Sequence, residues 1–418
     1  MKVYLISAVF PPEPLTTAMT SGDVASEMAR RGHDVTVFTT FPNRPSGLIS
    51  QGYKRKLWDI EEKTDYRIVR TWHTLSRRSS FLSRTLENIT YGLSSTLGLL
   101  LTKPPDVVYM NTWPIFAQNL NSLLLKARNI PIVSYVQDVY PESLSAKGML
   151  TRQRFSFRLA VQLDIAHLKR CYTILTLTES MCNLLISQRS VPKAKIKVIP
   201  NWLDESPYLK MHTKDHSFFT EHKINPDIFI AMFAGSLTMS AGVDIYVAAA
   251  KLLTERTDII LLLIGDGTSR QDIENQIVEN NLTNLRVIHP LLPNDVPRVQ
   301  AVADILMMSL SGEMAQNAAP SKQMSYMFSG RPILASINKN GTPAKIIEKA
   351  KAGFIIPPDN PGEIASLLIE LSKKRFVLTE MGENAQKFAL ANYSKSMVLP
   401  KIIEVIEASN RSGIGSRR

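Results

Sequence analysis

The chain has 418 residues, of which 44% are hydrophobic and 21% are charged, and its formal net charge is +12. This length and balance are typical of a soluble globular protein with two domains. The two cysteines, Cys171 and Cys182, exclude a disulfide framework and favour a reducing, cytoplasmic compartment. The apolar run Val3–Phe10 is too short for a signal peptide, and no stretch has the pattern of a transmembrane helix.

All of the excess charge lies in the first half. Residues 1–200 hold 26 basic and 14 acidic side chains, whereas residues 201–418 hold 23 of each. This asymmetry predicts that the first half faces an anionic partner, namely nucleic acid, acidic lipid head groups or a phosphorylated acceptor. The basic groups and their apolar neighbours are Lys54-Arg55-Lys56, Arg77-Arg78 and Arg84 beside Trp58, Phe81, Leu82 and Leu93–Leu101. These groups favour an anionic membrane surface as the partner. A nucleic-acid partner is less well supported, because the sequence shows no nucleic-acid-binding module with aromatic residues between the basic ones.

Short apolar runs alternate with helix-length segments along the first half. The expected strands are Lys2–Phe10, Asp34–Thr39, Arg67–Trp72, Asp106–Asn111, Ile132–Val136, Tyr172–Thr178 and Ile196–Ile199. Helical patterns lie between them, as at Met19–Arg31 and Gln153–Lys169. This alternation predicts a parallel sheet covered by helices on both faces.

The alternation pauses over residues 201–226, a polar and irregular segment that we interpret as a linker. It resumes with a second set of expected strands, Ile228–Ala234, Ile259–Ile264, Leu285–Ile288, Asp304–Ser309, Pro332–Ser336 and Phe354–Ile356. The final helices are expected near Pro361–Lys373, Phe376–Asn392 and Ser396–Ala408.

The sequence therefore predicts an α/β protein with two Rossmann-like doubly wound domains that face each other across a cleft. Residues 1–200 form the first domain, and residues 227–392 form the second. Residues 393–408 form a helix that packs back on the first domain, and residues 409–418 form a disordered tail.

Several kinds of chemistry have no signature in the sequence. It contains no GxGxxG turn, no phosphate-binding GxxxxGK[ST] loop and no GxSxG elbow, which argues against dehydrogenases, P-loop NTPases and hydrolases. No Asp-x-Asp pair or His/Cys cluster has metal-ligand spacing. We therefore expect neither a metal site nor a bound cofactor.

Two glycine-containing loops follow expected strands in the second half. Gly235-Ser236-Leu237 comes directly after Ile228–Ala234, and Gly265-Asp266-Gly267 comes after Ile259–Ile264. Glycines let a ligand approach the backbone, and free amides at a strand end favour a phosphate. Ordinary tight turns would show the same pattern.

A third segment runs from Glu313 to Lys322. Ser321 is a suitable N-cap for a helix that continues to Phe328. Lys322 then lies in the first turn, where the helix dipole disfavours a cation. A bound anion beside Lys322 explains this position better than solvent does.

Together these segments resemble a known family. The segments are Pro11–Pro14, Arg31–Val35, Gln137–Glu142, Val198–Asp204, Gly235–Leu237, Ile264–Gly267 and Ser321–Ile333, the last containing Ser-Lys, Tyr-Met and Gly-Arg-Pro-Ile. They are similar to bacterial polysaccharide glycosyltransferases of family 4, which have the GT-B fold, and to the fucose- and N-acetylfucosamine-transferase-like branch.

This resemblance implies which residues bind the donor, and it also marks departures. Family members often carry two glutamates seven residues apart, where this chain has Asn317 and Ser325, with Glu313 out of register. Relatives also place a base in the loop after the second domain's first strand, where Gly235–Gly242 has none. Lys322 is then the main cation for the diphosphate.

The resemblance further implies retaining transfer of a hexose-type sugar from a nucleoside-diphosphate sugar, with uridine as the expected base, to a lipid-linked or oligosaccharide acceptor. It assigns acceptor binding and a membrane-facing surface to residues 1–200 and donor binding to residues 227–392. The catalytic candidates are Asp138, which follows the strand Ile132–Val136 and is expected at the reacting sugar, together with Glu313 and Lys322. Glu13 and Thr17 are expected on the acceptor side. A nucleotide-sugar 2-epimerase and a non-catalytic partner of a polysaccharide assembly remain alternatives, because fold does not determine function.

Overall fold

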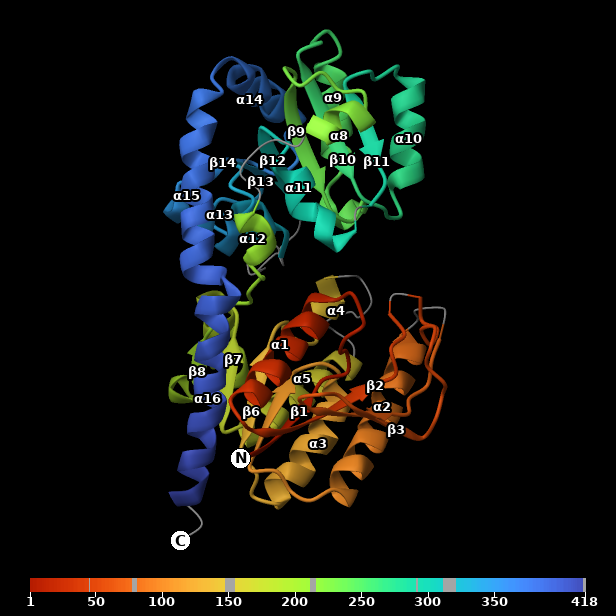
Figure 1. Ribbon diagram of the computed structural model, residues 1–418, viewed down its shortest axis with the longest axis vertical. Helices are drawn as coiled ribbons and strands as arrows, with labels where there is room; N and C mark the ends of the chain where they lie inside the picture. The colour runs from red at the N-terminus through yellow and green to blue at the C-terminus, as the bar shows by residue number, and fades with distance from the viewer. Residues whose placement is uncertain are drawn as a thin grey trace. The chain divides into compact units, whose positions relative to one another are not determined.

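The computed structural model describes residues 1–44, 46–76, 81–146, 155–210, 216–290, 292–310 and 321–415. The chain divides into two compact units. Unit 1 comprises residues 1–201 together with 398–418, and unit 2 comprises residues 202–397. Each unit contains one sheet with helices packed on it (Figure 1).

The sheet of unit 1 has eight strands in the order β3-β4-β2-β1-β5-β6-β7-β8. Their bounds are β1 Lys2–Ile6, β2 Asp34–Thr40, β3 Trp58–Glu62, β4 Arg67–Thr71, β5 Val107–Asn111, β6 Ile132–Val136, β7 Thr173–Thr176 and β8 Ile196–Val198. All neighbours are parallel except β3 and β4. Seven of these strands were expected from the sequence. We did not expect β3, because its half-exposed sequence Trp-Asp-Ile-Glu-Glu lacks the apolar run of a central strand.

Helices cover both faces of this sheet. Their bounds are α1 Thr16–Arg30, α2 Phe81–Leu101, α3 Ile115–Ala127, α4 Glu142–Ala146, α5 Phe155–Arg170 and α6 Glu179–Arg189, with the 3-10 turn η1 at Lys193–Lys195. The β1-to-β2 and β5-to-β6 connections run in opposite directions across the sheet. Right-handed crossovers therefore place α1 and α3 on opposite faces. Helices α2, α3 and α5 pack side by side.

The sheet of unit 2 has six parallel strands in the order β11-β10-β9-β12-β13-β14. Their bounds are β9 Phe229–Ala234, β10 Ile259–Ile264, β11 Leu285–Ile288, β12 Ile305–Ser309, β13 Ile333–Ser336 and β14 Gly353–Ile356. The helices are α9 Asp244–Leu252, α10 Arg270–Glu279, α11 Val296–Gln300, α12 Ser321–Phe328, α13 Thr342–Ala350, α14 Pro361–Lys373 and α15 Phe376–Tyr393, with 3-10 turns η2 Met239–Ala241 and η3 Pro293–Asp295.

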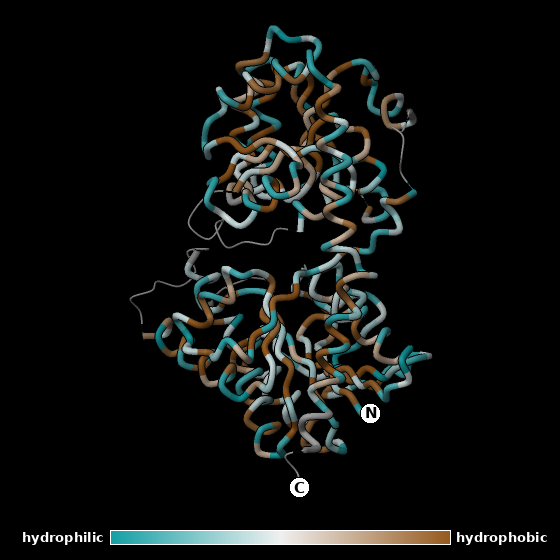
Figure 2. Tube along the Cα trace, turned by 90° about the vertical axis from the view of Figure 1, so that its left-hand side faces the viewer, coloured by the Kyte–Doolittle hydropathy of each residue, from teal (hydrophilic) through white to brown (hydrophobic). Residues whose placement is uncertain are grey.

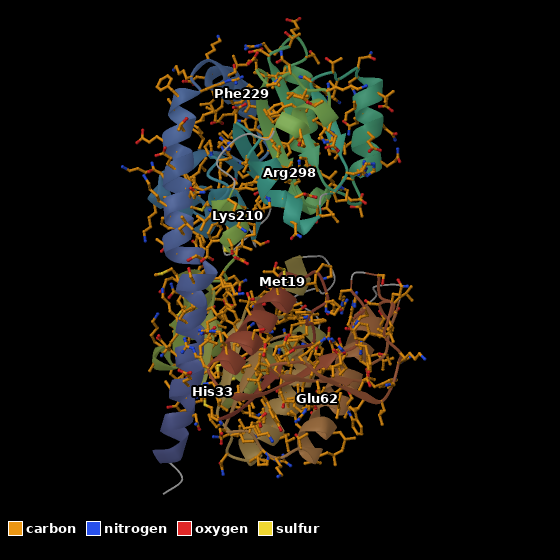
Figure 3. All side chains as sticks on the ribbon, in the orientation of Figure 1. Met19, His33, Glu62, Lys210, Phe229 and Arg298 are labelled. Carbon is orange, nitrogen blue, oxygen red and sulfur yellow. The ribbon has the colours of Figure 1, made fainter. Side chains whose placement is uncertain are left out.

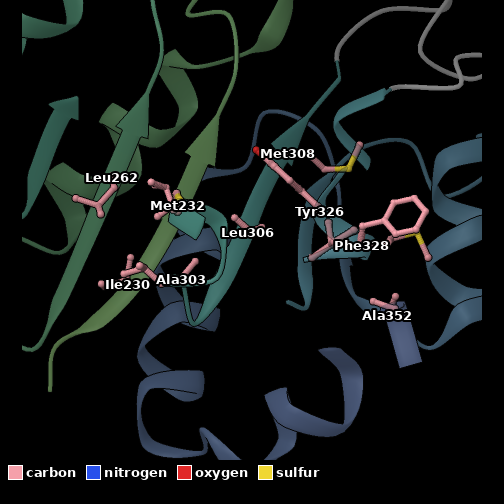
Figure 4. Packing of buried hydrophobic residues seen from close by; sticks show 14 of the residues in the cluster. Ile230, Met232, Leu262, Ala303, Leu306, Met308, Tyr326, Phe328 and Ala352 are labelled. Atoms are coloured by element: carbon pink, nitrogen blue, oxygen red, sulfur yellow. The ribbon is translucent and has the colours of Figure 1, made fainter. Parts of the chain in front are cut away.

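The strands of unit 2 are apolar on both sides because two separate clusters pack against them. Along β9, Phe229 and Phe233 face the cluster that includes α9, α10 and α14. Ile230 and Met232 face the other cluster, with α11, α12, α13 and α15 (Figure 4). This two-residue alternation is the geometry of a strand buried on both faces. Hydrophobic residues accordingly gather inside each unit (Figure 2).

The segment that we interpreted as a linker belongs to unit 2, so that interpretation is wrong. It contains two short helices, α7 Ser206–Leu209 and α8 His216–Glu221. Tyr208, Phe218 and Phe219 are buried in the same cluster as Ile230 and Met232. Their spacing follows no long helical or strand pattern, because each short helix contributes only one or two core side chains.

The last helix, α16, extends over Lys395–Gly415, and its residues from Val398 belong to unit 1. Glu407 pairs with Arg31 at 3.4 Å and with His33 at 3.0 Å, at the end of α1. Figure 3 labels His33 beside α16. The helix runs seven residues beyond the expected end at Ala408, so residues 409–415 are not the disordered tail that we predicted.

Candidate functional site

The site in unit 2 is built where β9 meets α12. The Tyr326 hydroxyl accepts a hydrogen bond from the Ala234 amide at 2.8 Å and donates one to the Ala234 carbonyl at 3.2 Å. Tyr326 is fully buried, so this pair holds α12 against the carboxyl end of β9. Ligands bind at this edge in open parallel α/β sheets.

Lys322 lies one turn before Tyr326 and therefore on the same side of α12. Its Nζ is 3.6 Å from the centroid of the Phe233 ring, the last aromatic residue of β9. Within the described part of the chain, the ammonium makes no hydrogen bond or ion pair besides this cation–π contact. Burial lowers the pKa of the Lys322 ammonium to about 7, because the ammonium loses hydration and none of the described carboxylates pairs with it.

Two glycines make this approach possible. A Cβ on Gly235 would lie 2.7 Å from Cε and 2.9 Å from Nζ of Lys322, and a Cβ on Gly265 would lie 1.9 Å from the carbonyl oxygen of Gly235. Both residues also have positive φ, +154° and +151°. The two predicted glycine loops therefore lie next to each other. The missing side chain of Gly235 leaves room for Lys322, and that of Gly265 leaves room for the backbone of Gly235.

The amides that we expected to bind a phosphate are mostly engaged within the fold. The Gly235 N–H donates to the Ile264 carbonyl and the Leu237 N–H to the Asp266 carbonyl, both at 2.9 Å, and the Gly265 N–H donates to Ile288 at 3.1 Å. The Leu237 side chain is fully buried in the core. The Leu237 amide is therefore engaged within the fold, and its donor-binding role stays a prediction. Within the described residues, the Ser236 amide makes no such bond.

A pocket of about 250 Å³ lies beside Lys322. Its lining residues come from the loop after β9, the end of β12 and the start of α12, namely Ser236, Thr238, Ala241, Met308, Ser309, Leu310 and Lys322. The Ser309 hydroxyl donates to the carbonyls of Ala241 and Gly242 and so fixes the 3-10 turn η2 over the pocket. This volume suits part of a ligand, since pockets for whole small molecules measure roughly 300–1,000 Å³.

The other predicted donor residues lie in different places. Ser321 is exposed at the first position of α12. The Ser325 hydroxyl faces unit 2's interior, bonding to Tyr208 Oη at 2.8 Å and donating to Gln300 Oε1 at 3.0 Å. Ser325 is thus committed to internal hydrogen bonds, and the structure does not bring it to the pocket. Glu313 and Asn317 lie outside the described residues.

The predicted acceptor residues occupy the carboxyl edge of the sheet in unit 1. The Thr17 hydroxyl donates to Gln137 Oε1 at 2.6 Å, which brings the first turn of α1 next to the end of β6. Asp138 follows Gln137 and is exposed. Thr17 and Asp138 are therefore close neighbours at this edge.

Glu13 has a structural position. Its carboxylate Oε1 accepts the backbone N–H groups of Asn43 and Arg44, each at 2.9 Å. Burial raises the pKa of Glu13, although these hydrogen bonds and the nearby Arg44 oppose the shift. The carboxylate holds the loop after β2, and the acceptor-side role of Glu13 stays a prediction.

Sequence reasoning missed an aromatic and cationic pair at the same edge. The Arg44 guanidinium lies 5.5 Å from the Trp113 ring and pairs with Glu87 at 2.6 Å. Arg44 and Trp113 are separated by 69 positions and follow different strands, so no local motif links them.

In the described residues no group of three or more His, Cys, Asp or Glu side chains is placed to hold a metal ion. The described helices also include none that is long and apolar enough to cross a membrane.

Solved structures identify the class of this fold. Anabaena HepE in complex with UDP superposes with a TM-score of 0.70 at 14% identity, covering 98% of this chain and all of that one. WaaG, a glycosyltransferase involved in lipopolysaccharide biosynthesis, superposes with a TM-score of 0.70 at 18% identity and covers 97% of this chain and 99% of that one. The protein has the GT-B fold of these glycosyltransferases.

Sequence comparison then places the chain in a family. Residues 20–206 match Glycosyltransferase Family 4, and residues 215–388 match the glycosyl transferases group 1. The probable glycosyltransferase WbjE of Pseudomonas aeruginosa is 25% identical over 78% of this chain and 80% of its own length. The putative colanic acid biosynthesis glycosyl transferase WcaI of Escherichia coli K12 is 21% identical over 77% of this chain and 80% of its own length. The chain belongs to the family 4 glycosyltransferases, as the sequence motifs predicted.

Proposed function

We propose that this glycosyltransferase moves a hexose-type sugar, with retention of configuration and without a metal ion, from a UDP-sugar to a lipid-linked or oligosaccharide acceptor in polysaccharide biosynthesis. The name of WcaI, a putative colanic acid biosynthesis glycosyl transferase, supports the biosynthetic setting. The HepE complexes with UDP and UDP-glucose support the donor class.

The observation that carries the proposal is the buried Lys322 ammonium, which has no anionic partner in the described residues. Sugar transfer leaves a nucleoside diphosphate, on which negative charge grows as the glycosidic bond breaks. An ammonium fixed beside this leaving group stabilises the transition state. In our proposal, Lys322 meets the diphosphate together with the Ser236 amide.

The donor also resolves the unfavourable burial of Lys322. With an empty pocket, the ammonium is only partly protonated near neutral pH because its pKa is about 7. A diphosphate within a few ångströms raises that pKa by direct attraction. Donor binding and full protonation of Lys322 are therefore coupled in this mechanism.

On the acceptor side we assign Asp138 and Thr17 to the reacting sugar and the acceptor. Asp138 is exposed at the end of β6, where a carboxylate can orient hydroxyl groups. With retention, the acceptor hydroxyl attacks from the face that the diphosphate leaves, and its proton passes toward the departing phosphate oxygen. We nominate no protein nucleophile.

A membrane surface is the second part of the proposal. Helix α2 exposes apolar side chains at helical spacing, namely Leu82, Leu86, Ile89, Leu93, Leu97, Leu100 and Leu101. Leu82, Leu93 and Leu101 are 79%, 58% and 68% exposed. The acidic residue of this helix, Glu87, is buried and pairs with Arg44 and Arg84. An apolar stripe without an exposed carboxylate suits an anionic bilayer.

Two of the basic residues named from the sequence make contacts within the fold. The Arg55 guanidinium lies 5.0 Å from the Trp72 ring, and Lys56 pairs with Asp59 at 2.7 Å. Arg77 and Arg78 lie outside the described residues, as does the side chain of Phe81. The exposed leucines of α2 are therefore the main support for the membrane surface.

The decisive experiment is a thermal-shift panel of nucleotide sugars on the native protein, Lys322→Ala and a matched control, Lys387→Ala. Lys387 is 75% exposed on α15. We expect one UDP-sugar to raise the melting temperature of the native protein and the control, but not of Lys322→Ala. No shift with any nucleotide sugar would favour the non-catalytic reading, and isomerised donor without acceptor would favour the epimerase.

A further inference from the structure

Unit 1 contains a second pocket, of about 590 Å³, at the amino edge of its sheet. The strands β6, β7 and β8 begin there, and α16 contributes Val405, Ala408 and Ser409 to the lining. Asp138 and Thr17 lie at the carboxyl edge of the same sheet. The pocket is therefore separate from the acceptor side of the proposed reaction.

The lining of this pocket is strongly basic. Five cationic side chains reach it, and none of the described lining residues carries a carboxylate. The five are Lys126, Lys169, Arg170, Lys195 and Lys197.

Neutral groups hold two of these cations, so their charges are not cancelled. Arg170 Nη1 donates to Asn119 Oδ1 at 2.9 Å and to Ser122 Oγ at 3.3 Å. Lys195 Nζ donates to the backbone carbonyls of Lys169 at 3.3 Å and Cys171 at 3.0 Å. Within the described chain, the ammonium groups of Lys126, Lys169 and Lys197 make no hydrogen bond or ion pair.

Helix dipoles explain only part of this cluster. Lys126 lies in the last turn of α3, and Lys169 and Arg170 lie in the last turn of α5, where cations are favourable. Lys195 and Lys197 come instead from η1 and β8. A helix end gives no reason for their positions.

The acidic side chains of α4 and α5 are committed to another partner. Glu142 and Asp164 both pair with the buried Arg189, at 2.6 Å and 2.7 Å. None of the described residues that line the pocket supplies a counter-charge, and an anion from outside would relieve the mutual repulsion of its cations.

We propose that this pocket binds a phosphate-bearing anion. Its volume is within the roughly 300–1,000 Å³ of small-molecule sites. The half-exposed Tyr172 ring and the α16 residues Val405 and Ala408 provide apolar contact for the remainder of the ligand. A lipid headgroup and a soluble polyphosphate share this chemistry. The site does not depend on sugar transfer.

The test uses the full chain with Lys322→Ala throughout, so that the unit 2 site does not contribute. One variant adds Lys169→Gln and Lys197→Gln, and its control adds Lys339→Gln and Lys345→Gln, two exposed lysines of unit 2. The net charge changes equally in both. Binding of pyrophosphate is measured by calorimetry, and binding to phosphatidylglycerol and phosphatidylcholine vesicles is measured by sedimentation.

We expect the Lys169/Lys197 variant to lose affinity by about tenfold or more relative to the control, since hydrogen bonds to charged groups are strong. A loss with pyrophosphate identifies a soluble ligand, and a loss only with phosphatidylglycerol identifies a lipid headgroup. Two results would overturn the proposal. One is equal binding of both probes by the variant and the control, and the other is no binding of either probe by the protein that carries Lys322→Ala alone.

Discussion

The Lys322 ammonium lies 3.6 Å from the centroid of the Phe233 ring, so the last aromatic side chain of β9 holds the cation of the neighbouring α12. An aromatic face attracts a cation without neutralising it. The charge therefore stays available to a ligand, which an ion pair with a carboxylate would prevent.

Replacing this ring should weaken donor binding. In Phe233→Leu the cation–π attraction, on the order of 0.5–2 kcal/mol, is lost and Lys322 is less well oriented. We expect a several-fold weaker affinity for the UDP-sugar by calorimetry. Phe229→Leu is the control, because Phe229 is equally buried in the same cluster but lies at the other end of β9. Equal losses in both variants would contradict a specific role for Phe233.

A methyl group at Gly235 should displace the lysine. The added Cβ of Gly235→Ala would come within 2.9 Å of Nζ, and the positive φ adds strain. We expect at least about a tenfold rise in KM for the donor, the size of one lost charged contact.

The matched control is Gly32→Ala, whose φ is +82° and whose Cβ would meet nothing within 4 Å. It should lower the melting temperature through backbone strain but leave KM unchanged. A normal KM in Gly235→Ala would show that Lys322 tolerates displacement.

Donor affinity should fall as pH rises above neutrality. The free protein holds Lys322 with a pKa of about 7, and binding requires the ammonium, so affinity should fall up to about tenfold per pH unit above that value. Binding measured between pH 6 and 9 tests this. In Lys322→Arg the cation stays charged, and the slope should disappear. A flat profile in the native protein would exclude coupled protonation.

The same shift predicts the pH dependence of stability without donor. The ordinary pKa of lysine, 10.5, applies to the unfolded chain, so between pH 7 and 10.5 the unfolded state binds more protons. The contribution of Lys322 to the free energy of unfolding therefore increases with pH in this window. The free energies of unfolding of the native protein and of Lys322→Met are measured with denaturant at pH 7 and pH 9. The difference between these two free energies should be smaller at pH 9.

The leucine stripe of α2 should determine vesicle binding. The double variant Leu93→Ser/Leu97→Ser removes two exposed apolar contacts, each worth roughly 1.5–3 kcal/mol when fully buried, and should reduce sedimentation with phosphatidylglycerol vesicles. Leu252→Ser/Val278→Ser changes two similarly exposed residues of unit 2 as a control. If both variants bind vesicles equally well, α2 is not the membrane surface.

The sequence by itself determined the two-sheet architecture and the family. Buried parallel strands such as Ile259–Ile264 are continuous apolar runs, and motifs such as Ser321-Lys322 are local, so both can be recognised without knowing long-range contacts. The edge strand β3 escaped recognition because its half-exposed sequence lacks an apolar run. The helices α7 and α8 escaped because each contributes only one or two side chains to the core.

Only the tertiary structure decided which predicted site residues are available to a ligand. Hydrogen bonds to residues remote in sequence commit Leu237, Ser325 and Glu13 to the fold. Among the described residues, the ammonium of Lys322 interacts instead with the Phe233 ring. The basic pocket at the amino edge likewise combines residues from 126 to 409. Whether a polar group is satisfied internally depends on such long-range packing, and a linear pattern carries no record of it.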